Sequence, residues 1–462
     1  MDPSNVNPAA VSKPKTLEEA IRAAQNMQRH GDLSAAEAVY LRILQVVPEE
    51  PNALHFLGIL RHQQGDNEGA TALIRRAIAV VPLDAGPWVN LGNIMLEMRL
   101  FDEAVDAYKQ AVVLSPYNLL VHNNIGLLQG RRNNLDLAEA AYLQALRIAP
   151  DADYVLQNYA GLLHRLGRYE EATSFSIKTL SASPNDPKAR RLLSISYALV
   201  GDLESARGVL RDWLELDPGN PEALHLLAGA GGLPVPARAS DAYIAEEFDA
   251  FAKSFDAKLE MLGYKAPELV TRALAEALNT VGPAGDVLDA GCGTGLCSIL
   301  LRPMARRLDG VDLSRGMLSK AAERGGYDQL ECAELTTYMA GNPCRWDSIV
   351  SADTLCYFGD LHDVLVAARI ALKLRGLLVF SVEAASSEIV EFSLQHNGRY
   401  AHGRSYIEGS VAAAGLELLS IELEILRAEV MRPVRGWIVV ARNGAVVQSR
   451  PQQTFGSAPT SL

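Results

Sequence analysis

Proline recurs at a fixed interval along the first half of this chain, and this spacing constrains the fold more than any other feature. Two columns of residues repeat every 34 positions. The prolines are Pro48, Pro82, Pro116, Pro150, Pro184 and Pro218. The second column, 12 residues before each proline, is Ala36, Ala70, Ala104, Ala138, Ala172 and Ala206. Such a period predicts an array of helix-turn-helix units, each of which buries its apolar face on the next.

A third column of small residues predicts where the two helices of each unit cross closely. Its members are Ala24, Gly58, Gly92, Gly126, Ala160 and Ser194. The third unit has the fullest pattern, with Trp88, Leu91, Gly92, Ala104, Tyr108 and Pro116. This pattern resembles the tetratricopeptide repeat. We therefore expect an all-α solenoid of six units and a short capping helix over residues 16–230, after a flexible tail at 1–15.

Asparagine occupies one matching position in three adjacent units, at Asn90, Asn124 and Asn158. An amide side chain both donates and accepts hydrogen bonds, so three of them could hold the backbone of an extended polypeptide. The column resembles the asparagine ladder of repeat domains that bind extended chains, which implies a peptide or protein partner on the concave face. The alternative is that these amides bond water or the neighbouring helix.

Composition excludes several classes of function. The net charge is −12 and neither half is basic, which argues against nucleic-acid or anionic-membrane partners. No apolar run approaches the roughly 20 residues of a membrane span, and the start MDPSNVNPAAVSKPK lacks the apolar stretch of a secretory signal. The five cysteines form no C-x-x-C pair, so we expect free thiols, no metal and a cytoplasmic protein.

The stretch DVLDAGCGTG, residues 286–295, is the most informative motif of the second half. It reads as a short buried strand, a glycine turn and the start of a helix near Leu296. The glycine spacing differs from the G-x-G-x-x-G of dinucleotide loops, and Asp289 before the turn disfavours a pyrophosphate. The stretch resembles motif I of class I S-adenosylmethionine-dependent methyltransferases. That resemblance implies S-adenosylmethionine as cofactor, with its ammonium near Asp289 and further contacts from Gly291, Cys292, Gly293, Thr294 and Gly295.

In this family a second acid follows about 20 residues later and holds the ribose hydroxyls. Asp312, at the end of an expected strand, lies 17 residues after Gly295 and meets this requirement. Glu334 stands where the family usually has Asp to accept from the adenine amino group. The other cofactor contacts that the resemblance implies are Leu313, Met317, Ala333, Leu335 and Asp353.

Further strands are expected at 329–333, 346–352, 376–383, 416–425 and 436–441. Together they predict an α/β Rossmann-like, seven-stranded class I methyltransferase domain over residues 240–442. A Gly- and Pro-rich linker at 231–239 precedes it, and a disordered tail at 443–462 follows. Aromatic residues near the start of the domain form either a core-facing stripe or a lid over the cofactor: Tyr243, Phe248, Phe251, Phe255 and Tyr264.

Four residues near the expected strand ends are candidates for catalysis: Asp353, Tyr357, Tyr400 and His402. For His402 the alternative is a surface loop histidine, and for Tyr357 a packing aromatic. The two halves together, with the segment Gly398-Arg399-Tyr400-Ala401-His402, resemble a bacterial family of predicted methyltransferases with tetratricopeptide repeats. We expect an enzyme that methylates a peptide or protein recruited by the repeats. The alternatives are a small-molecule methyltransferase that uses its repeats for assembly, and a cofactor-binding scaffold without turnover. Sequence leaves the acceptor atom and the oligomeric state open.

Overall fold

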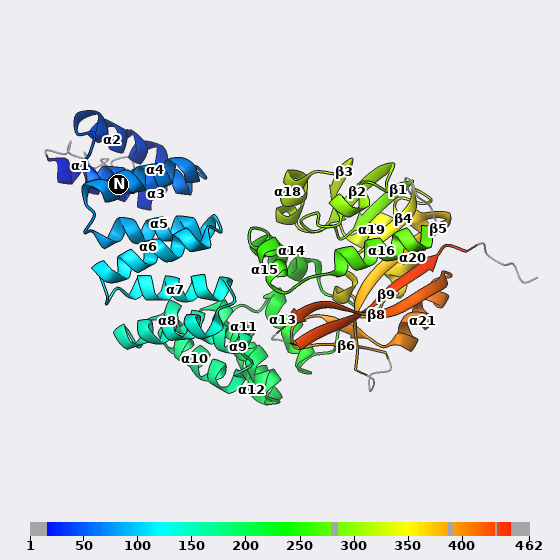
Figure 1. The fold of residues 1–462 in the computed structure, drawn as a ribbon. Coiled ribbons are helices and arrows are strands. Elements are labelled where there is room, and N and C mark those ends of the chain that lie inside the picture. The colour runs from blue at the N-terminus through cyan, green and yellow to red at the C-terminus, as the bar shows by residue number, and fades with distance from the viewer. Residues whose placement is uncertain (1–15, 279–284, 387–390, 430–431, 445–462) are drawn as a thin grey trace, which may run out of the picture. The chain divides into compact units, whose positions relative to one another are not determined.

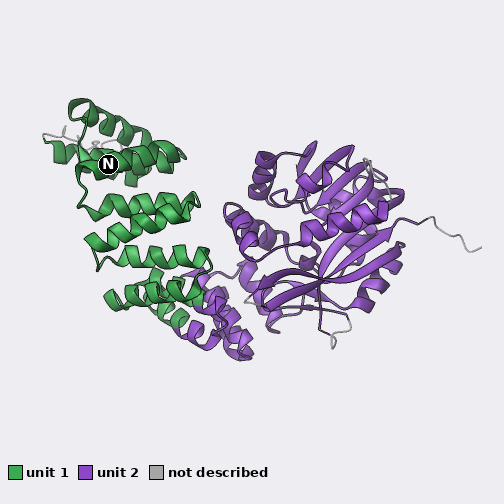
Figure 2. Cartoon of the chain, viewed as in Figure 1, with its two compact units in different colours: residues 1–162, 175–185 green, residues 163–174, 186–462 purple. Residues whose placement is uncertain are grey.

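A computed structural model provides the coordinates of the chain. It describes residues 16–278, 285–386, 391–429 and 432–444. The tail expected at 1–15 and most of the tail expected at 443–462 lie outside these ranges. The chain divides into two compact units (Figure 2), residues 1–162 with 175–185 and residues 163–174 with 186–462.

Twelve helices follow one another in pairs from Leu17 to Leu216, and their lengths alternate between 13 and 14 residues (Figure 1). This arrangement confirms the predicted helical repeats. The helices are α1 (Leu17–Arg29), α2 (Leu33–Val46), α3 (Pro51–Gln63), α4 (Asn67–Val80), α5 (Ala85–Glu97), α6 (Phe101–Leu114), α7 (Leu119–Arg131), α8 (Leu135–Ile148), α9 (Asp153–Arg165), α10 (Tyr169–Ala182), α11 (Pro187–Leu199) and α12 (Leu203–Leu216).

The residues that repeat in the sequence lie where two helices contact each other and where a helix ends. A Cβ atom on Gly92 would come within 2.5 Å of the Tyr108 ring, so the crossing of α5 and α6 requires glycine. Gly126 meets the ring of Tyr142 in the same way, also at 2.5 Å. Helix α2 ends two residues before Pro48, because proline disfavours the helical conformation of the residue that precedes it.

Helix α13 (Pro221–Gly229) occupies the place expected for a capping helix and, with α11 and α12, belongs to the second unit. Its His225 ring stacks on Tyr243 of α14 at 4.5 Å between centroids, and His225 Nε2 donates to the carbonyl of Gly398 at 2.9 Å. The next helices are α14 (Asp241–Phe251), α15 (Phe255–Met261) and α16 (Ala266–Leu278).

A nine-stranded mixed sheet forms the centre of the second unit. Its strands are β1 (Asp286–Ala290), β2 (Arg307–Asp312), β3 (Gln329–Cys332), β4 (Trp346–Ser351), β5 (Leu372–Ala384), β6 (Phe392–Leu394), β7 (Tyr400–His402), β8 (Glu417–Glu429) and β9 (Arg432–Arg442). The parallel order β3-β2-β1-β4-β5 continues into the antiparallel strand β9, which pairs with β8. The short hairpin of β6 and β7, which pairs with the end of β5, is an addition to the seven strands expected.

Helices cover both faces of this sheet because alternate residues of its strands are apolar on each side. Leu288, Ile349 and Phe380 belong to one buried cluster, which α19 (Leu335–Ala340), α20 (His362–Ala371) and α21 (Arg404–Ala413) complete. Their sequence neighbours Val287, Val350 and Val379 belong to the other, with α16 and the short helix α17 (Ser298–Leu301). The remaining elements are α18 (Arg315–Arg324) and the 3-10 turn η1 (Leu355–Tyr357).

The segment expected to be a linker is bound to the sheet domain over residues 237–239. Ala239 N–H donates to the Tyr357 carbonyl, and Gly359 N–H donates to the Ala237 carbonyl, both at 2.8 Å. Arg238 thereby forms an antiparallel bridge with Phe358. At the other end, the Asn443 side chain donates to backbone carbonyls of residues 369, 372 and 373, so order extends past the boundary predicted for the tail. None of the described helices is both long and apolar enough to cross a bilayer.

Candidate functional site

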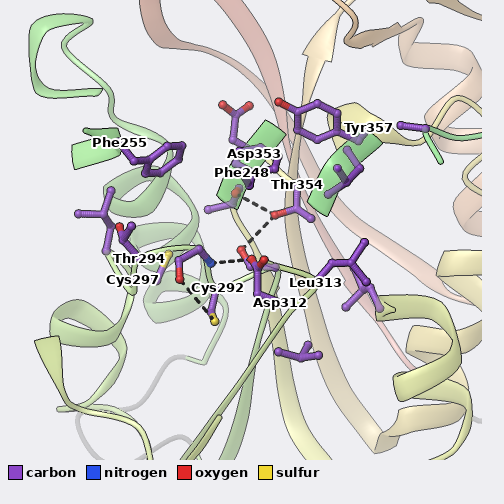
Figure 3. Close-up of a pocket in the computed structure, with 18 of the residues that line it drawn as sticks. Phe248, Phe255, Cys292, Thr294, Cys297, Asp312, Leu313, Asp353, Thr354 and Tyr357 are labelled. Atoms are coloured by element: carbon purple, nitrogen blue, oxygen red, sulfur yellow. Dashed lines mark hydrogen bonds between the residues drawn. The ribbon is translucent and has the colours of Figure 1, made fainter. Parts of the chain in front are cut away.

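A cavity of about 1080 Å³, counted out to its open mouth, lies at the carboxyl ends of the parallel strands. This is the edge where open α/β sheets bind ligands, because loops diverge there between neighbouring strands. The loops after β1, β2, β3 and β4 form its base, and α14 and α15 contribute aromatic side chains (Figure 3).

The glycine turn after β1 has the backbone shape that its sequence predicted. Gly291, Gly293 and Gly295 all have positive φ angles, of 78°, 54° and 83°. A Cβ on Gly291 would come within 2.3 Å of the Thr354 side chain, so the loops after β1 and β4 touch only because this residue is glycine. Among the described residues, no neighbouring atom lies within 4 Å of a Cβ built on Gly293, which leaves open space at this lining residue.

Asp312, at the end of β2, ties two loops together. Its Oδ2 accepts from Gly293 N–H and its Oδ1 from Ser314 N–H, both at 2.9 Å. Burial raises the pKa of this carboxyl, and the backbone N–H groups of Ser314, Gly293 and Leu313 oppose the rise. Asp312 therefore presents a fixed carboxylate to the cavity, and each oxygen keeps a lone pair for another donor.

Asp289 lies beneath the glycine turn, is 1% exposed and does not itself line the cavity. Its Oδ2 accepts from the Tyr327 hydroxyl at 2.6 Å, whereas Oδ1 is buried without a hydrogen-bond partner among the described residues. Burial raises the pKa of Asp289 to about 7, and the nearby charge of Asp312 adds to the rise.

The structure divides the other predicted cofactor residues into two groups. Cys292, Thr294, Leu313, Ala333 and Leu335 line the cavity, as predicted. Gly295 and the buried Met317 do not appear in the lining that the described residues form. Glu334 lines the cavity, but its carboxylate caps α19 by accepting from the N–H groups of Thr336 and Thr337 at 2.9 and 2.8 Å.

Asp353 and Tyr357, two of the predicted catalytic residues, lie together on the loop after β4. Asp353 has a φ of 54°, rare for a residue with a side chain, and its Oδ2 accepts from Arg427 Nη1 at 2.9 Å. Burial raises the pKa of Tyr357 to about 12, so its hydroxyl stays protonated at neutral pH. Phe248 packs edge-on against the Tyr357 ring, with centroids 5.5 Å apart.

Tyr400 and His402, the other two predicted catalytic residues, are fully buried on β7 and lie outside the described lining. Tyr400 donates its hydroxyl hydrogen to the Pro236 carbonyl at 2.8 Å, and His402 Nε2 donates to the Gly359 carbonyl at 3.1 Å. Burial lowers the pKa of His402 to about 4, so the ring is neutral at neutral pH. Both side chains support the backbone around the cavity, and neither has the surface position that the alternative reading gave His402.

Two arginines that the sequence reading did not select hold the charges at this end of the sheet. Arg427 of β8 is completely buried and contacts Asp353, Glu383 and Glu429. Arg399, at the turn before β7, bonds Glu429 and Glu383 and lines the cavity. Arg399 lies in the segment 398–402 noted in the sequence, but that segment does not reveal its partners, and no short motif contains Arg427, because most of their contacts join strands far apart in sequence.

The aromatic stripe divides into side chains that line the cavity and side chains that pack elsewhere. Phe248, Phe255 and Tyr264 line the cavity, as a lid would. Tyr243 instead packs on α13 as described above, and the Phe251 ring lies 4.2 Å from Lys258 Nζ.

In the repeats, the three asparagines donate to side chains of the preceding unit. Asn90 Nδ2 lies 2.8 Å from His55 Nε2, Asn124 donates to Asn93 at 2.7 Å, and Asn158 donates to Asn123 at 2.8 Å. Bonds to a neighbouring helix are the alternative considered for this column. All three side chains remain partly exposed.

Comparison with known proteins finds matches in each half of the chain. Tetratricopeptide repeat models match residues 21–85, 57–119 and 120–152, and a methyltransferase domain model matches residues 261–420. Human methyltransferase-like protein 27 is 35% identical over 116 residues, which are 25% of this chain and 45% of that protein. The malonyl-[acyl-carrier protein] O-methyltransferase of Acetivibrio thermocellus is 34% identical over 98 residues, 21% of this chain and 35% of that protein. The ribosomal protein L11 methyltransferase of Geobacter sulfurreducens is 35% identical over 113 residues, 23% of this chain and 38% of that protein.

The chain thus spans less than half the length of these curated relatives. The matches agree with the helical repeats and with the sheet whose glycine turn borders the cavity. The chain carries tetratricopeptide repeats followed by a methyltransferase domain.

Proposed function

We propose that the protein transfers a methyl group from S-adenosylmethionine to an acceptor on a peptide or protein that the repeats recruit. The observation that carries this proposal is the link between the glycine turn and Asp312 at the base of the cavity. Free thiols at all five cysteines suit a reducing compartment, so we place the reaction in the cytoplasm.

The residues at the cavity fit this donor. The open space at Gly293 lets a ligand approach the backbone, and the lone pairs of Asp312 suit two ribose hydroxyls. The unpartnered Oδ1 of Asp289 lies beneath the turn, where an ammonium reaching it through water would favour the ionised carboxylate. The Glu334 carboxylate caps α19. Glu334 would therefore bind the adenine through its backbone, or through its side chain in another rotamer.

The bound donor supplies a methyl carbon already activated by its sulfonium, so the protein contributes mainly alignment. Phe248 and Phe255 exclude water from the cavity. Asp353 and Tyr357 orient the acceptor, with Arg427 neutralising Asp353 and the Tyr357 hydroxyl kept as a donor. Tyr400 and His402 act indirectly, because they hold the backbone beside the loop that bears Asp353.

Donor binding tests the proposal most directly. Titration calorimetry should show S-adenosylmethionine binding to the wild type, and Asp312→Asn should weaken it about 10- to 100-fold, because a charged acceptor of two hydroxyl groups is lost. Asp363→Asn, a change on exposed α20 surface, is the control and should bind normally. Failure of the wild type to bind the donor would refute the proposed function.

The choice of a polypeptide acceptor rests on the repeats and on the relatives' names, two of which specify an acceptor borne by a protein. Replacing Asn90, Asn124 and Asn158 together by Ala should abolish turnover on polypeptide while donor affinity stays normal. Unchanged turnover would instead favour a small-molecule acceptor and repeats used for assembly. Donor binding without transfer to any cell fraction would favour the scaffold.

A further inference from the structure

The acceptor end of the cavity can be located from the strand order. The sheet runs β3-β2-β1-β4-β5, so Glu334 and Asp312 lie on one side of the glycine turn and Asp353 on the other. The donor, under the proposed function, takes the side of β1, β2 and β3. The acceptor must then enter on the side of β4 and β7, where Asp353, Tyr357 and Arg399 line the cavity.

Arg399 is held there with one edge of its guanidinium uncommitted. Nη1 donates to Glu429 at 3.0 Å and to Glu383 at 3.3 Å, and Nε lies 3.4 Å from the Tyr357 hydroxyl. Nη2 has no hydrogen-bond partner among the described residues, and the side chain keeps 22% of its surface exposed. A guanidinium fixed by two carboxylates and open on a third nitrogen is a preorganised donor for an anion.

Carboxylates outnumber guanidiniums by one in the cluster that holds Arg399. Arg427 binds Asp353 and shares Glu383 with Arg399, so the cluster contains three carboxylates and two guanidiniums. The sulfonium of a bound donor adds a positive charge on the facing side. The attraction for an anionic acceptor therefore comes from its short distances to that sulfonium and to Arg399 Nη2, and not from a net positive charge of the cluster.

The lining also limits which acceptors can react. Neither histidine nor lysine is present among the described residues that line the cavity. An amine of pKa about 10 arrives protonated and needs a base before it can attack, whereas a carboxyl of pKa about 4 arrives ionised. Tyr357 is protonated, and Asp353 accepts from Arg427 through Oδ2, while its Oδ1 has no hydrogen-bond partner among the described residues. A carboxylate acceptor reacts without using that oxygen as a base.

We propose that the methyl acceptor is a carboxylate, which Arg399 Nη2 binds and orients, and that the product is a methyl ester. This inference rests on the proposed function and specifies its acceptor class. One carboxylate oxygen forms a bond to the methyl carbon as the carbon–sulfur bond breaks, and sulfur keeps the electron pair of that bond. No proton moves, so no base is required.

The stability of the transferred label tests the acceptor chemistry on the wild type. The full chain is incubated with methyl-labelled donor and three probes: a Glu-containing peptide, its Gln counterpart, and a small dicarboxylate such as malonate. Label that mild alkali releases as methanol from the Glu peptide or malonate, with none on the Gln peptide, supports the proposal and tells the two sources apart. Alkali-stable label, or equal labelling of the Gln peptide, overturns it. Donor binding without labelling of either carboxylate probe also counts against it.

Variants of Arg399 test its role separately. Arg399→Gln should raise KM for the labelled carboxylate about 10- to 100-fold, and Arg399→Lys should have a smaller effect, because the charge remains but the planar fork is lost. Arg435→Gln, on an exposed position of β9, is the matched control and should leave KM unchanged. Circular dichroism checks that each variant is folded, and the alkali test on the wild type does not depend on them.

The Kd for S-adenosylmethionine distinguishes this inference from an alternative in which Arg399 binds the donor. It also tests the proposed function separately. The donor has a carboxylate of its own, so Arg399 could bind that group instead. Under the present proposal the Kd for S-adenosylmethionine stays within about twofold of the wild type in Arg399→Gln. A large rise in that Kd with an unchanged acceptor KM would assign Arg399 to the donor and overturn the inference, whereas absent donor binding in the wild type overturns the proposed function itself.

Discussion

The repeats and the sheet domain bury polar groups of different kinds. In the described repeats up to residue 162, the buried polar side chains are Glu50, which caps α3, and the neutral His55 and Asn123. The sheet domain buries ionisable side chains beside its cavity, among them Asp289, Glu383 and Arg427. Neutral amides join one repeat to the next at little electrostatic cost, whereas buried charges are expensive unless they are paired. The burial of ionisable groups, which costs free energy, therefore occurs in the domain where ligands are expected to bind.

Removal of Arg427 should have the largest effect. Arg427→Met leaves Asp353 and Glu383 buried without their main partner, and should lower the free energy of unfolding by about 3–5 kcal/mol. Denaturant unfolding measures this change. Arg427→Lys, which keeps the charge, should lose less, and equal loss in both variants would show that packing rather than charge dominates.

The next effect concerns the dependence of stability on pH at Asp289. Its pKa in the folded chain, about 7, exceeds the value near 4 of an unfolded chain, so folding favours the protonated form. The contribution of Asp289 to the free energy of unfolding is complete below about pH 4. This contribution is lost as the pH rises through 7, and the loss amounts to roughly 2–4 kcal/mol. Without donor, Asp289→Asn should be more stable than the wild type at pH 8 and should lack this decline. Parallel pH profiles for the two proteins would contradict the prediction.

In the repeats, the size of the side chain matters at the positions where two helices cross. Gly92→Ala places a Cβ against the buried Tyr108 ring and should cost about 1–3 kcal/mol. Gly161→Ala, in α9, meets no atom within 4 Å and should stabilise the chain by about 0.5–1 kcal/mol through helix propensity. Thermal unfolding of the two variants should shift in opposite directions, and a shared direction would show that the helix crossing tolerates a methyl group.

The smallest effect concerns the last repeat, which groups with the sheet domain. Arg191 of α11 bonds Glu247 of α14 at 2.7 Å and Glu222 of α13 at 3.0 Å. Arg191→Gln should cost about 1 kcal/mol and weaken donor binding a few-fold, since Glu247 precedes the cavity residue Phe248. Arg211→Gln, whose ion pair is exposed, is the control. Faster hydrogen exchange in α14 of Arg191→Gln alone would support this coupling, and unchanged exchange would contradict it.

Sequence predicted the parts of the fold that depend on local rules. The columns of proline, alanine and glycine located the repeat helices, because each column acts within one unit or between neighbours. The glycine turn and Asp312 were located in the same way, since a strand, a turn and an acid at fixed spacing lie in one short segment.

The rest depends on contacts between distant segments. Arg427 lies in no motif, and the segment 398–402 does not reveal the partners of Arg399. The pairing of β5 with β7 and β9, and of β9 with β8, brings Arg427 to Asp353 and Arg399 to Glu383. The same pairing buries His402, which sequence alone could place equally well on a surface loop. The hairpin of β6 and β7 was missed because three-residue strands give too little periodicity to detect.

The bridge between Arg238 and Phe358 limits how this chain can be recombined. Arg238 and Ala239 form part of the cavity wall, although they precede the first helix of the sheet domain. A graft that joined the sheet domain to another repeat array at Asp241 would lack part of the cavity wall. Exchange of the repeats should therefore preserve residues 237–239, which are bound to the sheet domain.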